Sequence, residues 1–203
     1  MNTPATSLLK ITLSTCLLIS LPMMGFAAID TPQKWKLDVP KTNVDFQVTY
    51  LGSGTVKGQF NKMNGSINYD VKNPTGTTIN FTVHTNSVDA GGSLRNAFLR
   101  RKELLNAAQY PTMTFVSKKV NMINAKEANV TGDFTVLGKT KPLTVKVTLA
   151  NVENDPVTLE PILKFRATGI IDRYTYGVTA FPSIVGNMIP LEISGNLVAA
   201  SQL

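Results

Sequence analysis

The chain has 203 residues but only one cysteine and one histidine, and each scarcity argues against a class of functional site. Cys16 lies inside an apolar N-terminal run that continues past it, which favours an ordinary apolar position over a lipoprotein attachment site. His84 is predicted to face solvent near a strand end, with no second histidine or close carboxylate pair to complete a metal site or a catalytic base. We therefore expect no catalysis and no metal or other cofactor.

Residues 1–27 have the features of a cleavable signal peptide. Lys10 supplies positive charge, residues 11–21 are almost entirely apolar, and Gly25-Phe26-Ala27 is a typical cleavage pattern. Because the run is about half of the roughly 20 residues that a membrane-spanning helix needs, we expect cleavage before Ala28 and export to the periplasm. Residues 28–203 then form one domain without thiols, and nucleic acid is not an expected partner. The formal net charge of +7 favours anionic surfaces.

Alternation of apolar and polar residues with a period of two dominates residues 28–203 and predicts strands. The predicted strands surround the apolar positions at 44–50, 67–71, 79–83, 113–115, 143–149, 163–167 and 191–197. Expected turns lie between them, at 52–54, 64–65, 73–76, 138–139 and 154–156. Gly52 and Gly54 fit a hairpin better than a nucleotide-binding loop, because a strand follows them instead of a helix. The pattern predicts an antiparallel all-β domain, either a sandwich or a closed barrel.

Residues 93–108 interrupt this alternation with near-helical spacing of apolar residues. We expect one helix or two short ones, with Ser93 as the N-cap and an end before Tyr110-Pro111. Basic residues at 95, 100, 101 and 102 lie beside Phe98 and Leu99. Such a segment can close a barrel mouth or contact a membrane surface, or it can be the solvated face of a helix lying across the barrel.

Four segments in the same order resemble the YceI-like family of periplasmic lipid-binding proteins. They are WKLD, NVDF, GQF and GSI at 35–67, RNAFL through YPTMTF at 95–115, GDFTVLGKTKP at 132–142 and IDRYTYG at 171–177. The resemblance implies an eight-stranded antiparallel lipocalin-like β-barrel with a short helical insertion, which favours the barrel over the sandwich. It also implies that the barrel binds a long isoprenoid or a related lipid, without catalysis.

On this reading, twelve apolar residues are expected to line the barrel: Phe46, Val48, Tyr50, Phe60, Ile79, Phe81, Val83, Phe98, Leu99, Phe115, Phe134 and Phe165. Four residues are candidates for polar contacts with a ligand near the mouth: Arg95, Asn96, Arg173 and Tyr174. The sequence departs from the family's R-D-x-H-L pattern at two positions, since Asn96 and Phe98 stand where the pattern has Asp and His. The departures either change the preferred headgroup or have a structural role.

The leading hypothesis is an exported protein that sequesters or transports a polyisoprenoid, a quinone or another long apolar molecule. A fatty-acid or fatty-amide binder is an alternative within the same class. A barrel filled by its own side chains, acting through its surface in a stress response or in partner binding, is an alternative from another class, and an enzyme using His84 is a third. The sequence leaves open the headgroup, the chain length, peripheral membrane contact and the choice between monomer and homodimer.

Overall fold

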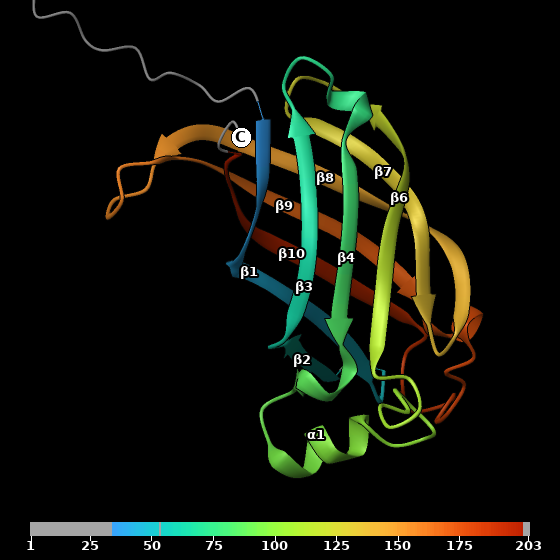
Figure 1. The fold of residues 1–203 in the computed structure, drawn as a ribbon. Helices are drawn as coiled ribbons and strands as arrows, with labels where there is room; N and C mark the ends of the chain where they lie inside the picture. The colour runs from blue at the N-terminus through green and yellow to red at the C-terminus, as the bar shows by residue number, and fades with distance from the viewer. Residues whose placement is uncertain (1–33, 53, 201–203) are drawn as a thin grey trace, which may run out of the picture.

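A computed structural model describes residues 34–52 and 54–200, so the predicted signal peptide, Cys16 and the cleavage site before Ala28 lie outside the described residues. The described chain is mostly β-strand, with one α-helix and three short 3-10 turns (Figure 1). The elements are β1 (Lys34–Tyr50), β2 (Gly54–Phe60), β3 (Met63–Asp70), η1 (Pro74–Gly76), β4 (Thr78–His84), η2 (Thr85–Ser87), β5 (Val88–Asp89), α1 (Ser93–Leu99), β6 (Thr112–Met122), β7 (Glu127–Val136), β8 (Lys139–Asn154), β9 (Pro161–Asp172), η3 (Arg173–Tyr176) and β10 (Met188–Ala199).

Eight strands form a closed antiparallel barrel, in agreement with the predicted architecture. The strands follow one another in the order β10-β9-β8-β7-β6-β4-β3-β1, and pairing of β1 with β10 closes the ring. The long strand β1 makes this closure possible, because its start pairs with β3 while residues 35–38 and 43–46 pair with β10. Strands β2 and β5 extend the sheet from the second half of β1. Closure excludes the sandwich and leaves a single interior.

The inward-facing residues follow the period of two that the sequence predicts. In β7, buried and half-buried residues alternate without interruption from Glu127 to Val136. Phe46, Phe81 and Phe165 are buried on their strands, whereas their outward neighbours on the chain reach solvent or are only half-buried. Since successive side chains point to opposite faces of a strand, one face of each strand encloses the barrel interior.

Around β3, one predicted strand position and one predicted turn were wrong. Val71 lies after the end of β3 and is exposed. Asn64 and Gly65 lie inside β3, and the chain turns before them, at residues 61–62. Gly65 pairs with Phe81 of β4, and a Cβ at Gly65 would lie 2.6 Å from the Phe81 ring. Because Gly65 has no side chain, the Phe81 ring can lie across β3 at this position. In the sequence, the same Asn-Gly pair is also typical of a turn.

The helical insertion is shorter than predicted. Helix α1 ends at Leu99, and residues 100–110 form successive turns in which Leu104 and Ala107 are buried. The N-cap residue is Gly92, and no side chain caps the helix, so the assignment of Ser93 as the cap was wrong. The apolar residues after Leu99 keep a near-helical spacing because the turns, like the helix, pack several apolar side chains against the end of the barrel. No helix in residues 34–52 and 54–200 is long and apolar enough to cross a membrane.

Candidate functional site

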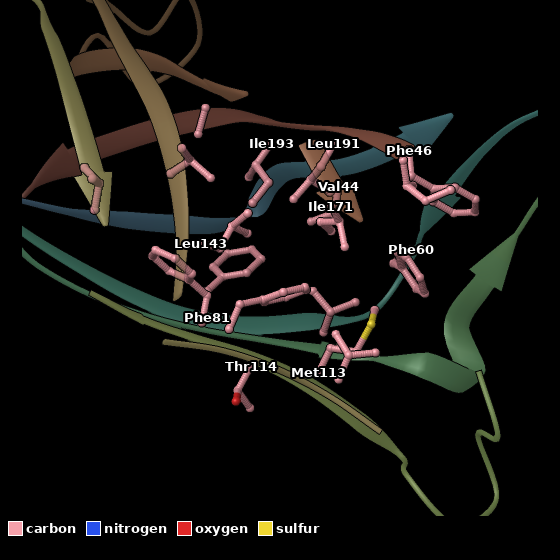
Figure 2. A pocket seen from close by; sticks show the side chains of 18 of the residues that line it. Val44, Phe46, Phe60, Phe81, Met113, Thr114, Leu143, Ile171, Leu191 and Ile193 are labelled. Atoms are coloured by element: carbon pink, nitrogen blue, oxygen red, sulfur yellow. The ribbon is translucent and has the colours of Figure 1, made fainter. Parts of the chain in front are cut away.

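A cavity of about 600 Å³ occupies the barrel interior. Its walls are formed mainly by inward-facing apolar side chains, nine of which are labelled in Figure 2 together with Thr114. The lining continues from Pro74 and Met122 at one end of the barrel to Leu104 and Ile184 at the other. The volume lies within the range of about 300–1,000 Å³ that is typical of small-molecule pockets. The barrel is therefore not filled by its own side chains.

All twelve residues that were expected to line the barrel lie around this cavity. Ten of them lie on strands, where the period of two indicates the inward side, and Phe98 and Leu99 come from α1. Whether they contact a ligand remains a prediction. Three further residues line the cavity from η3 and the loop after it and were not predicted: Tyr176, Val178 and Phe181. That segment has no periodicity from which an inward side could be predicted.

Arg173 is a structural anchor and is only 6% exposed. Its guanidinium group donates hydrogen bonds to the backbone carbonyl groups of four loop residues. These acceptors are Val178 at 2.6 Å, Ala180 and Val185 at 2.8 Å, and Gly186 at 3.0 Å. Four of the five N–H groups of an arginine are therefore engaged by the protein itself. Arg173 borders the cavity, but its role is to fix the loop between η3 and β10, and the expected headgroup contact does not fit this geometry.

Tyr174 does not line the cavity, contrary to the sequence-based expectation. Its ring is exposed and lies 4.7 Å from the guanidinium carbon of Arg173. The neighbouring aromatic residue, Tyr176, is buried and faces the cavity, with its ring 5.5 Å from that of Phe134. Which of the two tyrosines faces the cavity depends on the backbone turn of η3. The period of two that predicts the inward side of a strand does not apply to such a turn.

Asn96 also lies outside the cavity lining and has a local structural role. Its side-chain oxygen accepts a hydrogen bond from the Ala90 N–H at 2.7 Å, and its nitrogen donates one to the Asp89 carboxylate at 3.0 Å. Arg95 reaches the cavity lining, and its guanidinium also donates to the Ala90 carbonyl. Together the two residues hold α1 against β5. Asn96, which departs from the family pattern, therefore has a structural role.

The contact between Asn96 and Asp89 predicts a pH-dependent effect of replacing Asn96 with Asp. The hydrogen bond from Asn96 lowers the pKa of Asp89, with a smaller contribution from the Gly91 N–H. The stability that this provides is present above the unfolded-state pKa of about 4 and is lost as the pH falls through the folded-state pKa. In Asn96→Asp a second carboxylate replaces the donor, so we expect Tm at pH 7 to fall by a few degrees.

The Tm difference between Asn96→Asp and the wild type should shrink below about pH 4, because a carboxyl of the pair then takes up a proton. The exchanged pair, Asp89→Asn with Asn96→Asp, restores one donor and one acceptor and should recover Tm at pH 7. Thermal unfolding at both pH values is the measurement. Equal Tm values for the wild type and Asn96→Asp at pH 7 would contradict the structural role.

His84 lies at the end of β4, as predicted, and is half-buried on the outer face of the strand. Its Nε2 atom lies 3.1 Å from the side-chain nitrogen of Asn64. His84 does not line the cavity. Among residues 34–52 and 54–200, no three His, Cys, Asp or Glu side chains converge as metal ligands would. The side-chain partner of the His84 ring is thus the amide of Asn64.

At the end of the barrel that carries α1 (Figure 1), the cavity lining includes apolar side chains that are exposed to solvent. Four lining residues at this end are large, apolar and exposed, namely Tyr50 (40%), Phe98 (39%), Phe181 (39%) and Ile184 (48%). The Phe98 and Phe181 ring centroids are 5.5 Å apart, and Leu51 N–H donates to the Ile184 carbonyl at 2.7 Å. The β1–β2 hairpin, α1 and the loop before β10 thus surround one mouth.

The opposite end of the cavity is bordered by polar groups. Glu127 forms an ion pair with Lys146 at 2.7 Å, and Lys126 Nζ donates to the Asn151 side chain at 2.6 Å. Both Glu127 and Lys126 are part of the lining at this end. An apolar chain would lose contact with apolar surface on passing these groups. The end with α1 is therefore the better entrance for an apolar molecule.

The comparison with known proteins agrees with this architecture. A UPF0312 protein of Pseudomonas paraeruginosa is 39% identical over 113 residues, which are 56% of this chain and 59% of that protein. The alignment thus spans less than two thirds of that relative. A UPF0312 protein of Pectobacterium carotovorum subsp. carotovorum is 31% identical over 149 residues, covering 73% of this chain and 77% of that protein.

Solved structures share the fold. The crystal structure of BcnA of Burkholderia cenocepacia is 26% identical, with a TM-score of 0.70, and the match covers 81% of this chain and 99% of that one. A polyisoprenoid binding domain from Saccharophagus degradans has a TM-score of 0.57 at 13% identity, covering 84% of this chain and all of that one, and shows the fold alone. The family model described as a YceI-like domain matches residues 35–197. With the closed barrel and its ordered sequence motifs, this match places the chain in the YceI-like family.

Proposed function

We propose that this protein binds a long apolar lipid chain, such as that of a polyisoprenoid or a quinone, inside the barrel. The observation that supports the proposal most strongly is the continuous apolar lining of the cavity, which reaches the surface at the end with α1. Burial of a chain there would contribute roughly 25 cal/mol for each Å² of apolar surface removed from water. The fold of the polyisoprenoid binding domain from Saccharophagus degradans supports the same ligand class.

The two arginines of the lining at this end already donate to backbone carbonyl groups, so the cavity itself is not built around a ligand carboxylate. Arg173 donates to four backbone carbonyl groups, and Arg95 donates to the carbonyl of Ala90. In our proposal the apolar tail therefore provides most of the affinity, and the headgroup remains at the mouth.

We further propose that the protein acts after export, as residues 1–27 predict, and that it sequesters or transports its ligand in the periplasm. Binding, without chemical change of the ligand, is the activity that we propose. A solution state of monomer or homodimer is compatible with this activity, because the cavity lies within a single barrel.

A variant that fills the cavity tests the proposal. Ala167 lies on β9 with its side chain in the lining, so a phenyl ring in Ala167→Phe would enter the cavity. We expect at least a tenfold loss of affinity for a fluorescent polyprenyl probe. The matched control is Thr168→Phe on the outer face of the same strand, which should bind like the wild type. Displacement titrations of the three proteins, with Tm measured in parallel, make the comparison.

Wild-type affinity in a folded Ala167→Phe protein would contradict binding inside the barrel. If that variant does not fold, Ala128→Phe offers a second test from β7, where the side chain also lines the cavity. Retained affinity in this second folded variant would contradict the proposal in the same way.

A further inference from the structure

The mouth of the cavity is surrounded by apolar side chains that extend beyond the lining itself. Leu51 at the tip of the β1–β2 hairpin and Leu94 on α1 are strongly exposed. They lie on the same elements as the exposed lining residues Tyr50 and Phe98, and the loop with Phe181 and Ile184 completes the ring. We call this set the mouth rim: Tyr50, Leu51, Leu94, Phe98, Phe181 and Ile184. Exposed apolar groups gathered around one opening are typical of interaction sites.

Positive charge accompanies the mouth rim. Arg100, Arg101 and Lys102 follow α1 directly and are exposed, and Glu103 is the only acidic residue between positions 90 and 110. The guanidinium carbon of Arg101 lies 5.8 Å from the centroid of the Phe98 ring. None of the four ion pairs found in residues 34–52 and 54–200 involves these three basic residues. Their charges are therefore available to an external anionic partner.

A second exposed apolar tip, at the loop between β8 and β9, has the opposite charge. Val157 is 87% exposed, the same fraction as Leu94, and Leu159 is also exposed. Acidic residues Asp155 and Glu160 flank this tip. An anionic surface would repel the β8–β9 tip and attract the mouth rim. Charge thus distinguishes two surfaces of similar apolar exposure.

We infer that the mouth rim docks the barrel onto an anionic lipid bilayer. The apolar side chains of the rim enter the headgroup region, and Arg100, Arg101 and Lys102 contact the lipid phosphates. Each basic residue near an anionic surface strengthens binding by electrostatic attraction, and burial of the apolar side chains adds to this. The inference rests on the proposed function, because docking at the mouth lets an apolar ligand move between bilayer and cavity without crossing water.

The inference is tested by vesicle sedimentation, which measures how much of the purified protein binds to lipid vesicles. Vesicles of phosphatidylethanolamine and phosphatidylglycerol at 3:1 should bind the wild type at least ten times more strongly than phosphatidylcholine vesicles. Binding should weaken in 0.5 M salt, since the charge contribution is screened. Leu94→Glu and the double variant Arg100→Glu/Lys102→Glu should each lose at least tenfold.

Two matched controls change exposed residues away from the mouth. Val157→Glu mirrors Leu94→Glu at the β8–β9 tip, and Lys36→Glu/Lys72→Glu mirrors the double charge reversal. Both controls should bind the anionic vesicles like the wild type. Residues outside the described structure are the same in every protein compared, so they cannot cause a difference in vesicle binding between rim variants and controls.

Equal binding to both kinds of vesicle, or equal loss in rim variants and controls, would overturn the inference. So would a change of oligomeric state in Leu94→Glu without a change in vesicle binding, since the rim would then contact a second copy. Probe affinity measured in detergent-free buffer separates the two proposals. A rim variant that binds the probe normally but not vesicles supports docking, whereas a wild type that binds vesicles but no probe contradicts only the proposed ligand.

Discussion

Replacement of Phe81 by aspartate is expected to lower the free energy of unfolding by about 3 kcal/mol or more, and to abolish ligand uptake. Phe81 is buried in the cavity wall on β4, where it pairs with Gly65 of β3 and with Phe115 of β6. The substitution removes the ring and places a carboxyl group in an apolar wall, beside Gly65 and Phe115. The loss is comparable to a large part of the total stability of a domain, about 5–15 kcal/mol.

The destabilisation of Phe81→Asp should depend on pH in a defined direction. Burial raises the pKa of a carboxyl group because it disfavours the charged form. The folded variant therefore binds a proton more tightly than the unfolded chain, and its stability should fall as the pH rises above about 4. Urea unfolding at pH 4 and pH 7 measures the difference.

Asn80→Asp is the matched control for Phe81→Asp. Asn80 is the preceding residue on β4 and is exposed on the outer face of the barrel. A surface substitution of this kind usually changes stability by less than about 0.5 kcal/mol. Greater damage from Asn80→Asp than from Phe81→Asp would mean that the register of β4 is displaced by one residue and that its lining residues are wrong.

Arg173→Ala is the second substitution with a large expected effect, a loss of about 2–4 kcal/mol in the free energy of unfolding. The side chain donates to carbonyl groups of Val178, Ala180, Val185 and Gly186, so its removal leaves four acceptors of one loop without their donor. The loop also carries Phe181 and Ile184, which form part of the mouth. We therefore expect weaker ligand retention along with the lower stability.

Arg173→Lys separates charge from geometry. Lysine keeps the positive charge but lacks the planar fork of arginine, so it cannot reach four carbonyl groups at once. We expect partial recovery of stability and a faster proteolytic cleavage of the loop than in the wild type. Full stability in Arg173→Ala, measured by urea unfolding, would contradict the anchoring role and would leave the guanidinium group available to a ligand.

The barrel wall could be predicted from the sequence because a strand encodes its inward face by position alone. Phe46, Phe81 and Phe165 each share parity with neighbouring apolar residues, and each is buried. The choice of a barrel over a sandwich came from the family resemblance, since alternation is the same in both. Closure depends on the pairing of β1 with β10, a contact between the two ends of the domain that no local pattern contains.

The polar part of the site could not be predicted in the same way. Arg173 follows a strand and looks available in the sequence, but its partners are backbone carbonyl groups of a loop, which any residue type provides. Asn96 appears as a departure from a ligand-facing pattern, yet its partners are Asp89 and Ala90. Gly65 has the composition of a turn, and only the position of the Phe81 ring explains it as a strand residue.

The central claim is that the barrel cavity holds a long apolar chain. Native mass spectrometry of the protein purified without detergent tests it most directly. We expect a species heavier than the chain alone by the mass of one lipid, which is released intact on denaturation and is reduced in Ala167→Phe but not in Thr168→Phe. A wild-type protein that shows only the mass of the bare chain, and that remains so after incubation with polyprenyl lipids, would contradict the account.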